Sequence, residues 1–389
     1  MKERCVLQVT NYSSNYAGNF IPLLVRLEKA MAKIGLRQVY VFPETARAHK
    51  WSAALEAGGH QVVYLPVALD VLWSWRASVS VTAISALVAL AEQENCAILH
   101  THFNALDVAA WLALHWRPRS RSLPRLIWHC HSGRGAAVRG PLRILKDTIK
   151  LKGMARSVRT IAVSEAVKDE LVKYGCPPSR IQVVCNGIEL GRIHNSALSK
   201  EEARSMFGFA TGEPIILAQG WDPLTKGVDI LLKAFSRMNG RPARLVLIGA
   251  GRMEAMLDKW LSTSRPEWLT VIAPTEDLPK LYYAADVFVS ASRREGFPYS
   301  VLEALAAGLP VVSTDIPALA WAREIPSVSF VKPEDAESMA DQIVSTIGWP
   351  ASTRQQRVKQ SALIVREKFG ADRWVESVTK CYMSLLGQT

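Results

Sequence analysis

Short apolar runs alternate with longer segments of helical periodicity along the whole chain. In the first half, the runs with strand character are residues 5–10, 38–42, 61–65, 97–102, 125–131, 160–163 and 181–185. Amphipathic helical patterns lie between them, as at 20–33 and 79–93. Repetition of strand, helix and strand predicts a parallel sheet that is covered by helices on both faces.

The same alternation starts again in the second half. Its apolar runs are residues 214–219, 244–248, 269–272, 287–290, 310–313 and 328–331. A polar stretch at 186–199, which contains the turn-forming pair Asn186-Gly187, separates the two halves. We therefore expect an α/β protein with two Rossmann-like, doubly wound parallel-sheet domains that face a cleft.

The expected domains are residues 1–190 and 191–371. The final stretch, 372–389, contains apolar residues at helical spacing, which predicts a helix with one buried face. We expect this helix to pack back on the first domain. Ligands of open α/β sheets bind at the carboxyl ends of the strands, so residues that follow strands are the ones to examine for chemistry.

Length and composition agree with a globular protein of two domains. The chain has 389 residues, of which 49% are hydrophobic and 21% charged. No apolar window is long enough for a transmembrane helix, and the first apolar run is too short for a signal peptide, so we expect a cytoplasmic protein. The six cysteines form no C-x-x-C pair and are expected to be buried free thiols.

Positive charge is concentrated in one segment. Residues 117–159 hold twelve Lys or Arg and one acid, Asp147, and so carry nearly all of the net charge of +12. Such a patch indicates an anionic partner. Residues 141–156 combine an apolar helical face with basic neighbours, which is typical of a helix on a membrane surface. A solvated helix with an ordinary packing stripe is the alternative, and nucleic acid is not expected because no aromatic platform accompanies the charges.

The most informative motif begins where an expected strand ends at residue 290. Glu295 then lies in a loop, and Pro298 suits the entry of a helix. Glu303 falls inside that helix. The N–H groups of Tyr299 and Ser300 at its start could hold a diphosphate, and two carboxylates beside it suit sugar hydroxyls because a carboxylate accepts hydrogen bonds from a diol.

A second motif, residues 219–229, follows another buried strand and opens a helix. Lys226 within it could neutralise a leaving diphosphate as a point charge. In the loop after the first strand, Gly18 would let the backbone approach a phosphate or an acceptor, although a plain surface loop is nearly as good an interpretation. No G-x-G-x-x-G follows the first strand, which argues against a dinucleotide-binding dehydrogenase.

Two H-x-H pairs end two expected strands. They are His100 with His102 and His129 with His131, and each pair lies on one face of its strand. Four histidines at adjacent strand ends could bind zinc. No carboxylate or cysteine ligand is clearly placed with them, so we expect no metal site and interpret the first three as core or cleft-edge residues.

Together these motifs resemble the family 4 glycosyltransferases of the GT-B fold. The hallmark of that family is two glutamates separated by seven residues within E-G-F-x-x-x-x-x-E-A-x-A-x-G-x-P-V-V, which residues 295–312 match. Residues 161–165, 183–189 and 245–251 look like the family's serine turn, its interdomain N-G-I-D segment and its G-x-G turn. The resemblance extends over most of the chain.

The resemblance implies retaining transfer of a hexose-type sugar from a UDP- or GDP-linked donor to an acceptor hydroxyl, without a metal or a further cofactor. A lipid-linked acceptor or cell-envelope polysaccharide synthesis is the expected setting, and the inner membrane face the expected docking surface. The implied catalytic residues are His131, Glu295 and Lys226. The implied donor-binding residues are Gly18, Gly220, Lys226, Gly296, Phe297, Tyr299, Ser300 and Glu303, with Glu303 on the ribose and Glu295 on the transferred sugar.

One residue departs from the family pattern. Trp221 stands where the family's G-R-x-x-x-x-K-G has arginine, and tryptophan cannot clamp a phosphate through two parallel hydrogen bonds. Either Arg293 or Arg294 supplies the missing charge, or donor binding is weak, or catalysis is impaired. The alternatives to a transferase are therefore a non-catalytic GT-B scaffold module, or a sugar phosphorylase or epimerase on the same fold.

Overall fold

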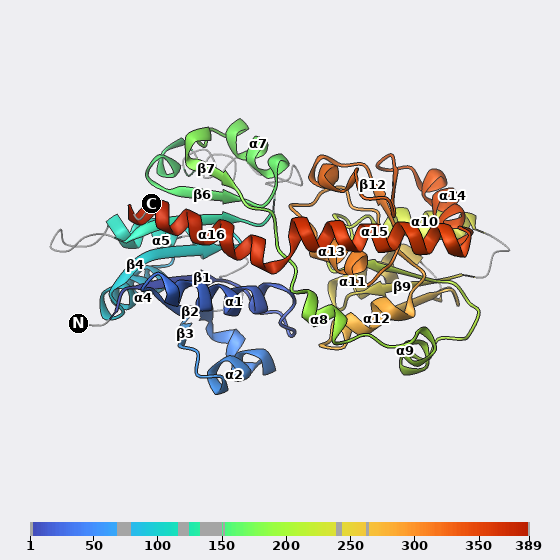
Figure 1. Cartoon of the computed structure of the whole chain (residues 1–389), viewed down its shortest axis with the longest axis horizontal. Helices are drawn as coiled ribbons and strands as arrows, with labels where there is room; N and C mark the ends of the chain where they lie inside the picture. Colours follow the sequence, from blue (N-terminus) through green and yellow to red (C-terminus); the bar gives the residue numbers. More distant parts are fainter. Residues whose placement is uncertain are drawn as a thin grey trace. The chain divides into compact units, whose positions relative to one another are not determined.

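The chain folds into two compact units, each built on a parallel sheet. The computed structural model describes residues 3–67, 79–115, 124–132, 150, 152–238, 243–261 and 264–387. The first unit comprises Met1–Asn186 and Asp372–Thr389, and the second comprises Gly187–Ala371 (Figure 1). Every strand pair in both sheets is parallel within the described residues, which confirms the α/β class.

The sheet of the first unit has the strand order β3-β2-β1-β4-β5-β6-β7. Its strands are β1 (Cys5–Thr10), β2 (Arg37–Pro43), β3 (Val62–Leu65), β4 (Cys96–His102), β5 (Arg125–Cys130), β6 (Arg159–Ala162) and β7 (Ile181–Val183). Every residue of β1 and β4 is buried, as expected for strands covered on both faces. The strand order reverses between β1 and β4, and their carboxyl ends are the place where open sheets bind ligands.

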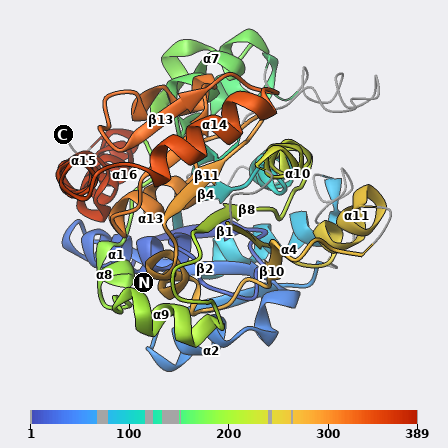
Figure 2. The ribbon, with the colours of Figure 1, turned by 90° about the vertical axis from the view of Figure 1, so that its right-hand side faces the viewer.

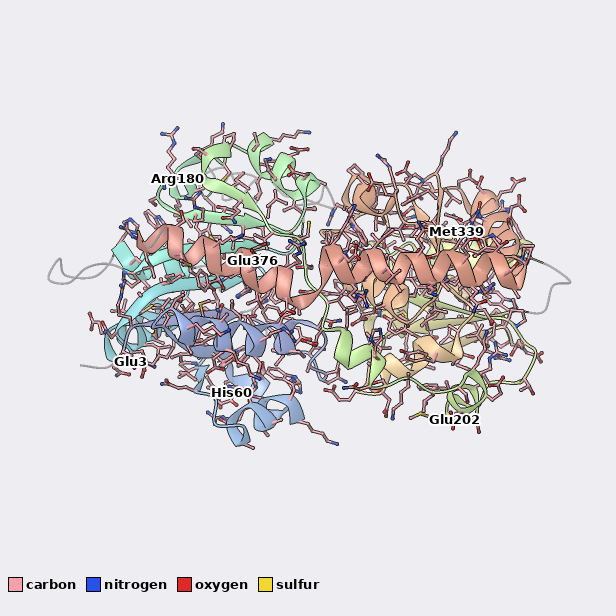
Figure 3. The ribbon with its side chains drawn as sticks, in the orientation of Figure 1. Glu3, His60, Arg180, Glu202, Met339 and Glu376 are labelled. Atoms are coloured by element: carbon pink, nitrogen blue, oxygen red, sulfur yellow. The ribbon has the colours of Figure 1, made fainter. Side chains whose placement is uncertain are left out.

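Helices on both faces complete this unit. They are α1 (Phe20–Lys33), η1 (Glu44–Ala48), α2 (Lys50–Ala57), α4 (Val81–Gln93), α5 (Asp107–His115), η3 (Met154–Ser157), α7 (Glu165–Lys173), η4 (Pro178–Arg180) and α16 (Ala371–Leu386). On α16, Trp374, Val378 and Tyr382 are buried while Glu376 is exposed (Figure 3). The Tyr382 hydroxyl meets Gln8 of β1 and His100 of β4, so this helix packs on the sheet of its own unit.

The second unit contains a sheet of order β10-β9-β8-β11-β12-β13. Its strands are β8 (Ile215–Gln219), β9 (Arg244–Ile248), β10 (Leu269–Ile272), β11 (Val287–Ser290), β12 (Val311–Thr314) and β13 (Val328–Val331). Its helices are α8 (Leu190–His194), α9 (Lys200–Phe207), α10 (Val228–Arg237), α11 (Arg252–Leu261), α12 (Leu278–Ala284), α13 (Tyr299–Ala306), η5 (Pro317–Ala322), α14 (Ala336–Ile347) and α15 (Ala351–Phe369). An apolar core joins the inner strands to α10, α11 and α14 (Figure 2).

The sequence pattern placed the strands, and the few helices for which it gave bounds, to within about two residues. The helix expected from residue 79 begins at Val81, because the Ser80 side chain accepts a hydrogen bond from the Ala83 N–H and caps it. The run at 181–185 forms a strand only as far as Val183. All six cysteines are free thiols, and all but Cys185 are fully buried. Among the described residues, no helix is both long and apolar enough to cross a membrane.

The basic segment is described only in part. Residues 116–123, 133–149 and 151, and with them most of the expected amphipathic helix, lie outside the described residues. Lys150 is described. The pattern of residues 141–156 made it one of the basic neighbours expected on the helix surface, and this expectation is wrong. The Lys150 side chain is only 4% exposed.

Lys150 belongs to a buried polar cluster. Its ammonium group binds one oxygen of the Asp107 carboxylate and lies 4.7 Å from the centre of the Trp128 ring. The Thr101 hydroxyl donates to the other Asp107 oxygen. A buried ammonium is costly unless it is paired, so Lys150 is held in the interior and is not available to an anionic partner.

We predict that Asp107→Ala lowers the free energy of unfolding by about 3–5 kcal/mol, because it leaves the Lys150 ammonium buried without its counter-charge. Urea unfolding followed by circular dichroism measures the change. The control is Glu376→Ala, which breaks the exposed pair between Glu376 and Lys380 on α16 and should leave the unfolding curve unchanged. Equal effects of the two substitutions would contradict this account of Lys150.

Candidate functional site

Lys226 and Glu295 meet in the second unit. They follow the neighbouring strands β8 and β11, and the Lys226 ammonium lies 2.6 Å from Glu295 Oε1. The Ser292 hydroxyl donates to the same oxygen at 2.7 Å. Glu295 Oε2 has no partner among the described residues, and Lys226 keeps further N–H groups to donate. The pair therefore offers an acceptor and donors side by side.

A close backbone contact holds the two loops together. Gly227 has a φ of +66°, and a side chain there would place its Cβ 2.0 Å from the carbonyl oxygen of Ala291. The Arg293 N–H also donates to the Thr225 carbonyl at 2.9 Å. Only glycine fits at position 227, and this contact brings the loop of Lys226 against the loop of Glu295.

Gly220 packs tightly for a different reason. A Cβ at this position would lie 2.2 Å from the sulfur of Met253, which is part of the apolar core of this unit. Gly220 therefore keeps the carboxyl end of β8 close to the first turn of α11. Gly220 lies in the same loop as Lys226, and because it has no side chain it can contact a ligand only through its backbone.

The start of α13 lies beside Glu295. The helix begins at Tyr299 after Pro298, without a side-chain cap. The N–H groups of Tyr299 and Ser300 have no acceptor among the described residues, as expected in a first helical turn. Such a terminus carries a partial positive charge that suits an anion.

Gly296 and Phe297, which connect Glu295 to this helix, are buried. The Phe297 ring packs on Trp321 and Phe369, with ring centres 4.7 and 5.4 Å apart. The Phe297 side chain is therefore part of an apolar cluster and is not available to a ligand.

Glu303, one turn into α13, is engaged at both oxygens. Arg192 of α8 lies 3.0 Å from Oε1, and the Tyr282 hydroxyl of α12 donates to Oε2 at 2.7 Å. Burial raises the pKa of the Tyr299 hydroxyl above its ordinary value, and the nearby Glu303 charge raises it further. Arg192 and Tyr282 together fix the orientation of the Glu303 carboxylate.

Trp221, Arg293 and Arg294 bear on the missing family arginine. The Trp221 side chain is 58% exposed, and its ring centre lies 5.2 Å from the Lys226 ammonium. Arg293 binds both oxygens of Asp229, each at 2.8 Å, and also pairs with Glu334. Arg293 is thus already engaged by two carboxylates, which favours Arg294 over Arg293 as a source of the missing charge. Arg294 is partly buried and has no hydrogen-bonding or ion-pairing partner among the described residues.

Gly18 and His131 belong to the first unit. Gly18 has a φ of +59° in the turn before α1, where a Cβ would lie 3.1 Å from the Tyr12 hydroxyl. His131 follows β5, and its Nε2 lies 3.1 Å from Nδ1 of His102. The Phe103 ring stacks on His131 with ring centres 4.3 Å apart. Burial lowers the pKa of His131 to about 3, so its ring is neutral at physiological pH.

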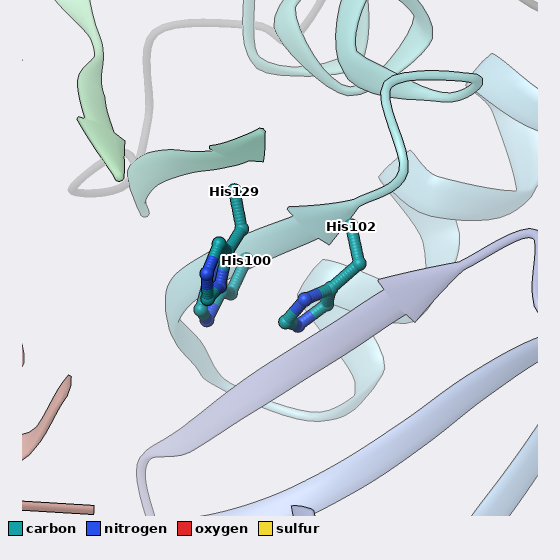
Figure 4. A group of neighbouring side chains, drawn as sticks. All are labelled: His100, His102 and His129. Atoms are coloured by element: carbon teal, nitrogen blue, oxygen red, sulfur yellow. The ribbon is translucent and has the colours of Figure 1, made fainter. Parts of the chain in front are cut away.

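The other three histidines form a buried cluster on β4 and β5 (Figure 4). Ligand nitrogens of His100, His102 and His129 lie within 4.8 Å of one another, so a metal ion is a candidate occupant. The His100 and His129 rings stack with planes 3° apart. A metal must lie in the plane of each imidazole that binds it, and two stacked parallel planes do not meet at one ion. Both ring nitrogens of His102 already have partners, so this arrangement does not favour a metal.

Burial also lowers the pKa of these three histidines, to about 3 for His100 and well below the ordinary value for His102 and His129. The cluster is therefore a set of neutral rings whose proton positions are decided by hydrogen bonds. The sequence pattern did not identify their partners Gln8 and Tyr382, nor Arg192, Tyr282 and Ser292 in the second unit. The one visible signal was Gln8, a polar residue inside the apolar run of β1.

Two family models match the chain. Residues 23–192 match the model described as "Glycosyltransferase Family 4", and residues 213–348 match "Glycosyl transferases group 1". The first match lies almost entirely in the first unit, and the second lies within the second unit and includes Lys226, Glu295 and Glu303.

Individual proteins are similar to the chain at lower identity. The uncharacterized glycosyltransferase MJ1607 of Methanocaldococcus jannaschii is 29% identical over 60% of this chain and 62% of its own length. The D-inositol 3-phosphate glycosyltransferase of Nocardia farcinica is 26% identical over 64% of this chain and 58% of its own. The chain thus spans about three fifths of these relatives. The crystal structure of Anabaena Alr3699/HepE in complex with UDP-glucose superposes with a TM-score of 0.77 at 15% identity, covering 98% of this chain and 100% of that one, and shares the fold.

We predict that Gly227→Ala destabilises the second unit by about 1–3 kcal/mol more than Gly212→Ala does, since both residues have a positive φ but only Gly227 faces a backbone oxygen. A Cβ at Gly212 would have no atom within 4 Å, so this control isolates the clash with Ala291. Thermal unfolding of the two variants beside the unmodified protein measures the difference. Equal destabilisation would show that the close contact does not hold the two loops.

Proposed function

Because the chain belongs to the group 1 and family 4 glycosyltransferases, we propose that it transfers a hexose-type sugar from a nucleoside diphosphate to an acceptor hydroxyl with retention of the anomeric configuration. The observation that carries the proposal is the pair of Lys226 and Glu295, which join at the carboxyl ends of adjacent strands beside a helix N-terminus. A cation for the leaving group and an acceptor for sugar hydroxyls are the two groups that the reaction requires.

In this proposal the diphosphate charge is met by Lys226 and by the N–H groups of Tyr299 and Ser300. Lys226 can hold Glu295 and a phosphate oxygen together because an ammonium group donates three hydrogen bonds. Arg294 is the further cation that we assign to the diphosphate in place of the family arginine. With these groups present, the transfer needs no metal ion.

Glu295 and Glu303 recognise the two sugar rings of the donor. Glu295 Oε2 accepts a hydroxyl of the transferred sugar, and Glu303 accepts the ribose hydroxyls. Arg192 and Tyr282 hold Glu303 in one orientation before the donor arrives, which reduces the loss of conformational freedom on binding. His131 of the first unit contacts the transferred sugar near the reacting centre.

The donor base is uridine or guanosine, and the known Anabaena complex with UDP-glucose favours uridine. A thermal-shift screen of nucleoside diphosphates and nucleotide sugars identifies it. The same screen separates the transferase from a scaffold module, which has no need to bind nucleotide. Product analysis separates transfer from phosphorolysis or epimerisation, in which the sugar ends on phosphate or stays on the nucleotide.

We predict that Glu295→Gln and Lys226→Met each lower the transfer rate at least about 100-fold, because each removes a charge that acts on the transition state. The control is Glu213→Gln, which breaks a partly buried pair with Arg244 at 2.8 Å in the same unit and should transfer at close to the unmodified rate. Rates are measured with the donor found in the screen, after circular dichroism confirms folding. Near-normal transfer by either site variant would refute the assignment.

We also propose that the basic segment docks the protein on the cytoplasmic face of a membrane, where a lipid-linked acceptor is available. The buried Lys150 takes no part. Without Lys150, residues 117–159 still carry a strongly positive net charge, and each Lys or Arg near anionic lipid contributes about 1 kcal/mol.

Flotation with vesicles of anionic phospholipid should carry the protein at low salt and release it at high salt. The double variant Lys146→Glu, Lys152→Glu should float less, because it reverses two charges of the segment. A matched double variant on α7, Lys168→Glu with Lys173→Glu, should float like the unmodified protein. Absence of flotation at low salt would leave a soluble acceptor as the better proposal.

A further inference from the structure

A line of hydrogen-bonded side chains crosses the sheet of the first unit. It contains one residue from each of β2, β1 and β4 and the residue that follows β5, namely Gln38, Gln8, His102 and His131, and these strands are neighbours in that order. In the register, Gln38 is opposite Val6, Gln8 is opposite His100, and His102 is opposite His129. On each next strand, the member of the line therefore lies two residues after the residue that is paired with the previous member. An offset of two residues keeps all four side chains on one face of the sheet, and the line runs towards the carboxyl ends of the strands.

The hydrogen bonds in this line have directions that follow from its first member. Gln38 Nε2 donates to the carbonyl oxygen of Leu24 at 2.8 Å, and a carbonyl can only accept. Gln38 Oε1 therefore faces Gln8 and accepts from Gln8 Nε2 at 3.0 Å. This orients the Gln8 amide, so that its Oε1 faces His102 Nε2 at 2.9 Å.

The two histidines continue the same direction. Because Gln8 Oε1 can only accept, His102 Nε2 carries a proton and donates it. Full burial keeps His102 neutral, so Nδ1 of His102 holds a lone pair. His131 Nε2, at 3.1 Å from that nitrogen, must then carry the proton of this hydrogen bond. A neutral His131 is left with a lone pair on Nδ1, which has no partner among the described residues.

We propose that Gln38, Gln8 and His102 are positioning residues that fix His131 in the Nε2–H tautomer and so make its Nδ1 a hydrogen-bond acceptor for substrate. The proposal deepens the proposed function and rests on it for the role of His131. An acceptor nitrogen suits a sugar hydroxyl, which can donate. It does not suit a phosphate oxygen, which offers only lone pairs. His131 is thereby assigned to the transferred sugar and not to the diphosphate.

A side branch to Tyr382 and His100 takes the second amide hydrogen of Gln8 and leaves the direction of the line unchanged. The second hydrogen of Gln8 Nε2 goes to the Tyr382 hydroxyl at 3.0 Å, and the hydroxyl then donates to His100 Nδ1 at 2.6 Å. Gln8 thus uses both amide hydrogens and its oxygen inside the sheet. The Phe103 ring stacks on the face of the His131 ring, whereas the Nδ1 lone pair of His131 lies in the plane of that ring.

The tautomer can be read directly in the ligand-free, full-length protein. A sample with ¹⁵N-labelled histidine rings gives long-range ¹H–¹⁵N correlation spectra in which a protonated ring nitrogen and one with a lone pair differ widely in shift. The His131→Gln variant identifies the His131 signals by their loss. We expect His131 to be neutral at pH 7 with its proton on Nε2. A proton on Nδ1, or a mixture of both forms, would overturn the proposal whatever the variants below do.

Two substitutions separate the line from its side branch. Gln8→Leu removes the acceptor that orients His102, so the His131 signals should become those of a mixture. Transfer should fall roughly 10- to 100-fold, a loss of the size found when the hydrogen-bonding partner of a metal-ligating histidine is removed. The matched control, Tyr382→Phe, alters only the branch to His100. It should shift the His100 signals, leave those of His131 in place and keep transfer close to the unmodified rate.

The outcomes distinguish this inference from the proposed function. If Gln8→Leu mixes the tautomers of His131 but transfers at the unmodified rate, the link between tautomer and reaction is refuted while transferase activity stands. If Tyr382→Phe disturbs His131 as much as Gln8→Leu does, the directional line is refuted. If the unmodified protein transfers no sugar, the proposed function fails, and the spectrum still decides whether the line fixes His131.

Discussion

The candidate site of the second unit depends on a backbone contact that any side chain at position 227 would prevent. At position 227 the backbone turns with a positive φ directly against the Ala291 carbonyl, and this approach brings Lys226 within ion-pair distance of Glu295. The two loops follow the adjacent strands β8 and β11, so the sheet brings them near each other. The absence of a side chain at Gly227 then allows their backbones to touch. The backbone packing of the two loops therefore places the two charged groups. Groups fixed in this way can stabilise developing charge without reorganising.

A different constraint governs the first unit, where polar side chains lie in the middle of a sheet that is buried on both faces. Water cannot reach them, so every amide and ring must find its partner in the protein or remain unsatisfied. The result is a line of side chains that starts at the carbonyl of Leu24. Because this carbonyl can only accept, it fixes which atoms of Gln38, then of Gln8 and then of His102 donate and which accept. His129 is the exception, since neither of its ring nitrogens has a partner among the described residues. The structure gives no physical account of why it is tolerated there.

The sequence predicted the strands well because alternation of strand and helix is a local signal. It also placed Glu295 in a loop and Glu303 inside the helix that follows, as the structure has them. It did not predict which groups would engage them. Arg192 lies 111 residues from Glu303, and nothing in the local pattern around either residue indicates the other. Lys150 shows the same limit, because a lysine at helical spacing among other cations looks exposed until the fold places Asp107 beside it. Gln8 was the detectable case, since an amide inside a buried strand must be hydrogen-bonded to something.

The arginines near the donor site show why position along the chain is a poor guide to a phosphate ligand. Arg293 and Arg294 both lie within two residues of Glu295, yet Arg293 donates the in-plane N–H groups of its guanidinium to Asp229 and Glu334 and so ties the loop of Glu295 to α10. Those bonds satisfy the geometry that makes arginine a good clamp for phosphate, and a diphosphate would have to displace two carboxylates to compete. Trp221 occupies the family arginine position without any charge and rests near the Lys226 ammonium instead. The positive charge available to a donor is therefore carried by Lys226, Arg294 and the start of α13, and an aromatic face lies where a second clamp would be. Under the proposed function, Trp221 therefore adds no charge against a bound diphosphate, and the leaving group depends on Lys226, Arg294 and the start of α13.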